Sequence, residues 1–224
     1  ETVLALARVL RASGATFGVL RREKCSGDAA RRLGNDLLFQ QLAEFNIGQM
    51  RAAGAQKILS ICPHCVRTIG EDWKEFGADF EVIHHSEWLA SHLPESAVQG
   101  GGKVVYHDPC YLGRYRGVYD EPRRVAALAG QLVEPARNRD RGFCCGAGGG
   151  LTFLGEEPGT RVSHVRAAEL QASGADRVAV ACPFCRSMLE DAMAATSGSA
   201  APRLADIAEI AAEQLPDSGD SSRS

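Results

Sequence analysis

Eight cysteines are the residues of this chain best suited to chemistry, and they form two sets that repeat along the sequence. Each of three cysteines in the first half lies 120 residues before a cysteine in the second half. The pairs are Cys25 with Cys145, Cys62 with Cys182, and Cys65 with Cys185. Because a fixed offset indicates a duplicated structural unit, the sequence predicts two related units that each present thiols.

The second half of the chain contains the richer set of thiols. Its five cysteines are Cys110, Cys144, Cys145, Cys182 and Cys185. Five thiolates can surround one inorganic centre, and a C-x-x-C pair directs two sulfurs at a single metal. The glycines that follow the adjacent pair, beginning with Gly146, allow the backbone to turn N–H groups toward anionic sulfur. His107 is a further candidate for donating a hydrogen bond to such a centre.

The first half keeps only part of this pattern. It contains the first set alone: Cys25, Cys62 and Cys65. The position equivalent to Cys144 is Lys24, and the counterpart of Cys110 would lie before Glu1. We therefore expect a degenerate repeat with a second, incomplete site, in a C-terminal fragment of a longer polypeptide. One upstream cysteine would complete a set able to hold a [4Fe-4S] cluster or Zn²⁺, and a metal-free repeat is the alternative.

Short apolar segments alternate with helix-forming segments along both halves. The predicted strands are residues 16–20, 57–61, 80–84, 103–107, 132–134 and 177–181. The predicted helices include residues 3–12, 28–53, 86–92 (capped by Ser86), 121–129 and 160–172. The alternation predicts an α/β fold of two pseudo-repeated α/β units with mainly parallel sheets. Because each cysteine follows a strand closely, we expect the thiols at the C-terminal edges of the strands, near the interface of the units.

The glycine-rich segment at 99–102 is the best candidate for a linker. It divides the chain into a first repeat at 1–99 and a second, complete repeat at 103–215. Each repeat would then have about 100 residues, enough for a hydrophobic core. The polar tail at 216–224 is expected to be disordered.

The composition excludes several classes of function. The net charge of −3 gives no reason to expect nucleic acid as a partner. No apolar run approaches 18 residues and no signal peptide is visible, so the cysteines are better explained as metal ligands or redox thiols than as disulfides. A basic patch follows Cys110 and is expected to be solvated: Arg114, Arg116, Arg123 and Arg124.

The spacing Cys110…Cys144-Cys145-Gly146…Cys182-x-x-Cys185 resembles the cysteine-rich CCG domain, which normally occurs in tandem. Similar proteins include the B and D subunits of heterodisulfide reductase, the iron–sulfur subunit of glycolate oxidase and the C subunit of anaerobic glycerol-3-phosphate dehydrogenase. The resemblance covers nearly all of residues 1–215. It implies that the five cysteines of the second half bind a [4Fe-4S] cluster, which in this family can take a non-cubane form.

The resemblance also implies an oxidoreductase that transfers electrons through iron–sulfur clusters, with no catalytic residues beyond the cluster ligands. The module would pass electrons between a partner dehydrogenase, or an upstream ferredoxin-like domain of the same polypeptide, and a quinone or disulfide. We expect a cytoplasmic location. An upstream segment with membrane helices would place the module at the inner face of the membrane.

Two other functions compete with this interpretation. A structural thiolate-zinc scaffold would use the same cysteines, because thiolate-rich sites suit Zn²⁺ as well as iron. Cluster-free thiol–disulfide exchange is suggested by Cys62-Pro63-His64-Cys65, since such motifs at helix starts have lowered thiol pKa values. The repeated C-P-F-C motif at Cys182 counts against a thioredoxin-like domain, which does not explain matched cysteines in a second repeat.

Overall fold

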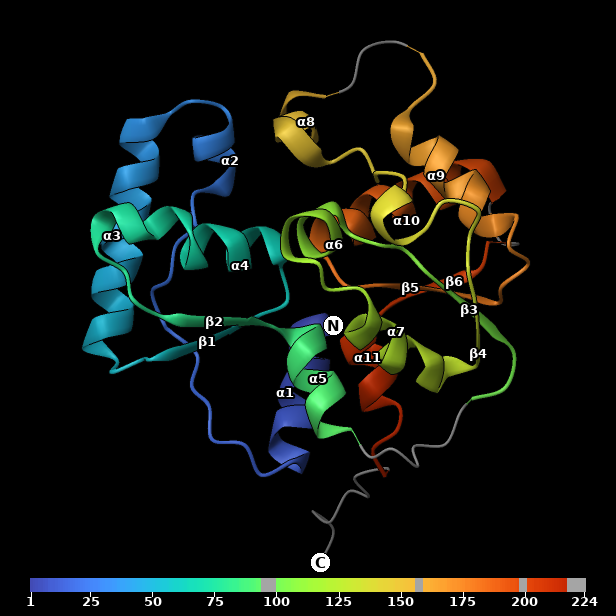
Figure 1. Cartoon of the computed structure of the whole chain (residues 1–224), viewed down its shortest axis with the longest axis horizontal. Helices are drawn as coiled ribbons and strands as arrows, with labels where there is room; N and C mark the ends of the chain where they lie inside the picture. The colour runs from blue at the N-terminus through green and yellow to red at the C-terminus, as the bar shows by residue number, and fades with distance from the viewer. Residues whose placement is uncertain (94–99, 156–158, 198–200, 217–224) are drawn as a thin grey trace, which may run out of the picture.

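Two separate parallel sheets organise the chain in the computed structural model, which describes residues 1–93, 100–155, 159–197 and 201–216 (Figure 1). The first sheet pairs β1 (Lys57–Ser60) with β2 (Glu81–His84). The second sheet has the order β4-β3-β5-β6, and its strands are β3 (Lys103–Tyr106), β4 (Gln131–Val133), β5 (Arg177–Val180) and β6 (Arg203–Asp206). Every strand pairing in the described part of the chain is parallel. The prediction of two α/β units with parallel sheets is confirmed.

The duplication extends from the cysteines to the elements around them. The first unit contains the succession β1, α4 (Pro63–Gly70), β2 and α5 (His85–His92), and the second contains β5, α10 (Pro183–Ser197), β6 and α11 (Ile207–Ala212). His84 caps α5 and Asp206 caps α11, each in a capping box with a glutamate three residues later. The two units therefore share local geometry as well as thiol spacing.

The first unit is completed by helices that precede its sheet. These are α1 (Thr2–Ala12), α2 (Asp28–Arg32) and α3 (Asp36–Ala52), and a 3₁₀ helix, η1 (Asp72–Phe76), follows α4. Phe39, Ala43 and Ile47 from α3 pack against Trp73 in a cluster that we call the first-unit core. The indole Nε1 of Trp73 donates to the carbonyl of Ser26 at 3.0 Å, which anchors the loop after Cys25 to this core.

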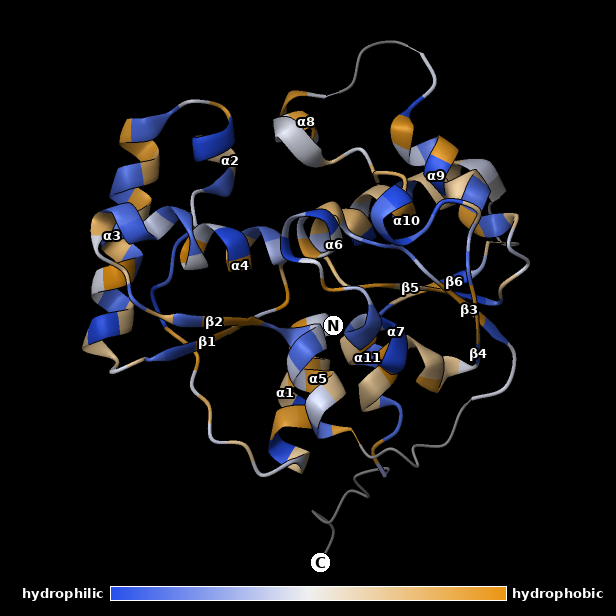
Figure 2. Cartoon of the chain, viewed as in Figure 1, coloured by the Kyte–Doolittle hydropathy of each residue, from blue (hydrophilic) through white to orange (hydrophobic). Residues whose placement is uncertain are grey.

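The second unit places helices on both faces of its four-stranded sheet. Its further helices are α6 (Cys110–Arg116), α7 (Asp120–Ala126), α8 (Leu151–Leu154) and α9 (Val162–Gln171), with 3₁₀ turns η2 (Ala127–Ala129), η3 (Arg139–Arg141) and η4 (Gly148–Gly150). α9 and α10 cover one face, where Leu170 and Leu189 pack on Val178 and Val180 (Figure 1). Figure 2 shows β5 in the apolar colour along most of its length, as expected of a strand buried on both faces.

The other face of this sheet is covered partly by the first unit. Helices α1 and α5 pack there beside α7 and α11 (Figure 1). Leu6 of α1 and Leu89 of α5 join Val104, Tyr106 and Ile210 of the second unit in a cluster that we call the shared core. Each fully buried aliphatic side chain contributes about 1.5–3 kcal/mol. The two units are therefore held together by apolar burial and not by a linker alone.

Several local predictions were wrong. Residues 16–20 form no strand, because they run along the surface and Val19 is 73% exposed. The helix predicted at 28–53 is two helices, because Gly34 has a φ of +78° and the Asn35 side chain accepts from the N–H of Leu38 to cap α3. His84, not Ser86, caps α5. The helix predicted at 121–129 continues only as the 3₁₀ turn η2 beyond Ala126.

The predicted linker and tail fall mostly outside this description. Gln99 and residues 217–224 lie beyond the described residues. Within the described part, Gly102 has a φ of +92° and packs against Asp176, so the end of the glycine run is part of the second unit. Among the described helices, none has the length and apolar character that crossing a membrane requires.

Candidate functional site

Parallel strands of both units end at cysteines along the boundary between the units. Cys62 follows β1 and caps α4, and Cys182 follows β5 directly before α10. Proline occupies the first helical position after each, where its missing N–H costs nothing. Cys65 and Cys185 lie in the first turns of these helices. This geometry gathers sulfurs where helix N–H groups favour negative charge.

The thiols form one continuous line of contacts. The five cysteines of the second unit interact in the order Cys110, Cys144, Cys145, Cys185 and Cys182. The line then crosses into the first unit, where Cys182 contacts Cys62 and Cys62 contacts Cys65. The structure thus brings together all five cysteines predicted as cluster ligands. It also places two cysteines of the first set beside them.

Cys25 is not part of this line within the described chain. It is exposed, and its Sγ accepts from the backbone N–H of Gly27 at 3.5 Å. Its neighbour Ser26 donates instead to the Sγ of Cys65 at 3.4 Å. All eight cysteines are free thiols. The first set is therefore not gathered into a group like that of the second unit.

Burial and crowding make the thiols compete for ionisation. The pKa of Cys144 falls to about 2 because its thiolate is hydrogen-bonded by Cys110 and then by Cys145. The same contacts raise the pKa of Cys145 to about 12 and raise that of Cys110. Only a positive centre lets all five ionise together, and a metal–sulfur cluster supplies one. The donor set therefore fits such a group.

The glycine-rich loop after Cys145 provides backbone donors to this centre. The N–H of Gly146 donates to the Sγ of Cys144 at 3.3 Å. Gly146 has a φ of +93°, in the left-handed region that favours glycine. The turn that aims this N–H at sulfur is therefore built on a residue without a side chain.

His107 lies against the same thiols. It is fully buried, and one ligand atom each of His107, Cys145 and Cys185 lie within 4.8 Å of one another. Its Nδ1 accepts from Nε of Arg166 at 3.0 Å. Burial, and then the charge of Arg166, lowers the pKa of His107 to about 3, so the ring is neutral. Within the described chain, Nε2 of His107 has no hydrogen-bond partner.

Two arginines that support the site were missed by the sequence reasoning. Arg123, predicted to lie on a solvated surface, is 5% exposed and binds Asp108 through two nitrogens at 2.7 and 2.9 Å. It also binds Glu134, while Asp108 accepts from the backbone N–H of Arg139. These bonds hold the loop that presents Cys110. Arg166 gave no sequence signal, because its partner His107 is 59 residues away.

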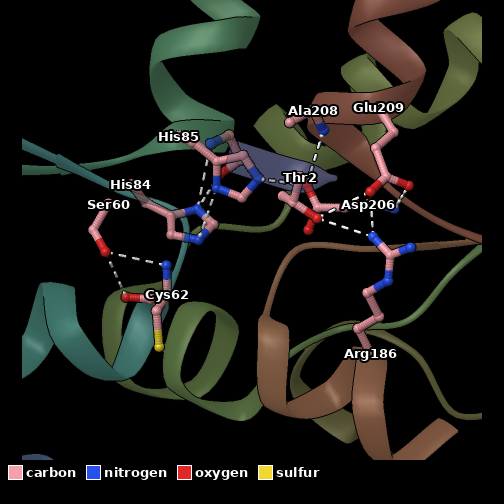
Figure 3. Close-up of polar contacts among 10 residues, drawn as sticks. Thr2, Ser60, Cys62, His84, His85, Arg186, Asp206, Ala208 and Glu209 are labelled. Atoms are coloured by element: carbon pink, nitrogen blue, oxygen red, sulfur yellow. Dashed lines mark hydrogen bonds and ion pairs between the residues drawn. The ribbon is translucent and has the colours of Figure 1, made fainter. Parts of the chain in front are cut away.

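A buried chain of hydrogen bonds joins the two units beneath the thiols (Figure 3). Nδ1 of His84 bonds Ser86, and its Nε2 lies 3.2 Å from Nδ1 of His85. Nε2 of His85 lies 3.0 Å from Oδ1 of Asp206 in the second unit. Burial lowers the pKa of His84 well below its usual value. The His84-His85 pair is thus an end-of-strand structural feature that bridges the units.

A small pocket of about 20 Å³ opens at the boundary of the units. Its lining includes Asp28, Arg32, His64, Gly150, Phe153 and Phe184. His64 stacks on Tyr111 at 3.7 Å between ring centroids, and its Nδ1 lies 2.9 Å from Asp28. Burial alone raises the pKa of Asp28, but His64 and Arg32 outweigh it and lower that pKa. His64 precedes Cys65 and Phe184 precedes Cys185, so the pocket lies next to the helix starts that carry these two thiols.

Comparisons with known proteins find a matching family model and several relatives. The family model described as a cysteine-rich domain, CCG, matches residues 1–70 and 104–190. The chain is 37% identical over 219 residues to the EtfAB:quinone oxidoreductase of Syntrophomonas wolfei, covering 92% of this chain and 31% of that protein. It is 38% identical over 222 residues to a probable iron-sulfur-binding oxidoreductase, FadF, of Bacillus subtilis, covering 96% and 32%.

A methanogen protein is also similar. The D subunit of the dihydromethanophenazine:CoB–CoM heterodisulfide reductase of Methanosarcina mazei is 36% identical over 200 residues, covering 84% of this chain and 49% of that protein. The chain thus spans about a third of the first two relatives and half of the third.

Proposed function

Because the chain belongs to the family of cysteine-rich CCG domains, we propose that it is the iron–sulfur electron-transfer module of an oxidoreductase. The observation that carries the proposal is the continuous contact of five thiols from separate strand ends. The relatives named above are iron–sulfur or heterodisulfide redox proteins, which supports the same class of chemistry.

The second unit would hold the cluster through its five cysteines: Cys110, Cys144, Cys145, Cys182 and Cys185. A [4Fe-4S] cluster, in a non-cubane form, would supply one-electron transfer when bound. The chain's own residues bury the site, and the N–H of Gly146 offsets negative charge on sulfur. An acceptor would approach over the small pocket lined by His64 and Phe184, while the apolar cluster around Cys145, Cys182 and Cys185 excludes water from the thiols.

Electrons would come from a partner dehydrogenase or an upstream ferredoxin-like domain, and they would leave to a quinone or a disulfide. Two of the relatives, an EtfAB:quinone oxidoreductase and a heterodisulfide reductase subunit, support both acceptors. The module would act in the cytoplasm, at the inner face of the membrane where an upstream segment provides an anchor. No nucleic-acid partner is proposed.

We further propose that the repeats divide at residues 1–99 and 103–215, and that the first repeat keeps a second, incomplete site. Cys62 and Cys65 are in contact and could hold a [4Fe-4S] cluster or Zn²⁺ with help from Cys25 or an upstream ligand.

The test is anaerobic purification with assays of iron, sulfide and zinc, and electron paramagnetic resonance on oxidised and reduced samples. We expect iron and sulfide in the native chain. Cys145→Ser should abolish the cluster signal of the second unit, whereas the matched variant Cys25→Ser should retain it. Zinc without sulfide would refute the redox proposal in favour of a scaffold. A metal-free chain active in thiol–disulfide exchange would refute it in favour of thiol chemistry.

A further inference from the structure

The orphaned nitrogen of His107 is the strongest unexplained feature near the site. Nε2 of this fully buried ring has no hydrogen-bond partner within the described residues. Buried polar atoms in proteins are almost always hydrogen-bonded. One nitrogen of the ring lies within 4.8 Å of the sulfurs of Cys145 and Cys185. Because Nδ1 is already bonded by Arg166, Nε2 is the nitrogen left to meet these sulfurs. Its missing partner therefore belongs to whatever the thiols hold.

Arg166 decides what this nitrogen can do. A guanidinium carries only donors, so its Nε–H, 3.0 Å from Nδ1 of His107, forces that nitrogen to accept. A ring nitrogen that accepts a hydrogen bond carries no proton, so the ring proton is on Nε2. A histidine that binds metal through Nε2 normally donates its Nδ1–H to an oxygen, which is the reverse of this arrangement. His107 is therefore a hydrogen-bond donor to the centre and not a ligand of it, despite its closeness to the sulfurs.

The structure holds Arg166 in place for this contact. Arg166 lies on α9 with no exposed surface, and its Nη1 donates to the carbonyl of Arg137 at 2.9 Å and to Glu169 at 3.0 Å. The His107 backbone N–H donates to the carbonyl of Ala179 in β5, which fixes the other side of the pair. Neither residue has freedom to turn away, so the tautomer and its direction are built into the packing.

We propose that Arg166 is a positioning residue that fixes His107 in the Nε2–H tautomer and directs this N–H at a sulfur of the cluster. The inference rests on the proposed cluster of the second unit. An N–H donor stabilises the more negative, reduced cluster, so the pair raises its reduction potential. Loss of one such charge-assisted bond changes an equilibrium on the order of tenfold, which is about 59 mV for one electron.

The first test is a double-mutant cycle on the reduction potential of the iron–sulfur form, measured by titration monitored by electron paramagnetic resonance. His107→Phe and Arg166→Met should each lower the potential by about 59 mV. Arg166→Lys, which keeps a donor, should restore most of the loss. In the His107→Phe background, Arg166→Met should add nothing. An additive shift would show that Arg166 acts through its own charge, and an unchanged potential in His107→Phe would overturn the proposal outright.

The second test does not depend on the cluster. Nitrogen NMR of ¹⁵N-histidine-labelled chain, stripped of metal and still folded by near-ultraviolet circular dichroism, reports the tautomer directly. We expect Nε2–H in the native chain and a mixture of tautomers in Arg166→Met. Nδ1–H in the native chain would overturn the role of Arg166. Absence of iron and sulfide with the Nε2–H tautomer intact would instead count against the proposed function alone. If the stripped chain does not fold, the potential cycle decides by itself.

Discussion

Replacing Leu89 by alanine should weaken both units of the chain at once. Leu89 belongs to α5 of the first unit, yet it is fully buried in the shared core against the sheet of the second unit. Truncating a fully buried leucine costs about 2–5 kcal/mol, because apolar contact is lost and a cavity remains. We expect the free energy of unfolding to fall by about 3 kcal/mol, the middle of that range.

The two tryptophans of the chain allow each core to be followed separately. Trp73 is fully buried in the first-unit core, and Trp88 lies in the shared core. Trp73→Phe keeps Trp88 as the fluorescence reporter, and Trp88→Phe keeps Trp73. Each variant is unfolded in urea under anaerobic, reducing conditions with the same metal content. With a slope of roughly 3 kcal/mol per M, Leu89→Ala should lower the urea midpoint by about 1 M at both reporters.

The matched control is Leu37→Ala. Leu37 is 68% exposed on α3, so its truncation should change the free energy of unfolding by no more than about 0.5 kcal/mol. A shift of the Trp88 transition that left the Trp73 midpoint in place would refute the reasoning. The two cores would then unfold independently, and the shared core would not couple the units.

Three further perturbations test the support of the site. Arg123→Ala leaves a buried carboxylate unpaired and should cost about 3–5 kcal/mol by thermal unfolding, whereas its exposed neighbour Arg124→Ala should change little. Burial raises the pKa of Glu169, but hydrogen bonds from two arginines outweigh it and lower that pKa. The stability that ionised Glu169 contributes is therefore complete above its unfolded pKa and is lost as the pH falls through its folded pKa. Glu169→Gln should flatten the acid limb of a plot of unfolding free energy against pH. An unchanged acid limb would contradict this. Gly146→Ala places a side chain at a φ of +93° and should cost about 1–3 kcal/mol and reduce bound iron. The control is Gly48→Ala: a Cβ there meets open space on α3, so this change should raise the free energy of unfolding by about 0.5–1 kcal/mol.

The architecture could be predicted because its signals are local. The alternation of strands and helices and the 120-residue offset both lie in the order of the residues, and they gave the α/β units. The break between α2 and α3 was also readable, since Gly34-Asn35 is a typical stop followed by a cap. β6 was not among the predicted strands although it repeats β2, because only two of its four residues, Arg-Leu-Ala-Asp, are apolar.

The supporting contacts could not be predicted, because they join residues far apart in sequence. His85 and Asp206 are separated by 121 positions, and nothing in either neighbourhood indicates the other. Arg123 lies among other arginines in the sequence, a pattern that indicates an exposed surface. In the fold it is bonded by Asp108, before Cys110, and by Glu134, after β4. Such contacts depend on how whole elements pack, and a charge at a buried position has no local pattern of its own.

The bond between His85 and Asp206 makes the two repeats differ at the contact that joins them. In an ancestral pair of identical repeats, the positions of His85 and its equivalent, Ile207, would have carried the same residue. If the second unit now paired with a copy of itself, Asp206 would face Ile207 across the boundary and leave its carboxylate without the partner it has here. Burying a charge without a partner is costly. The two units are therefore complementary at this contact, and two copies of the second unit would lack the bond between His85 and Asp206.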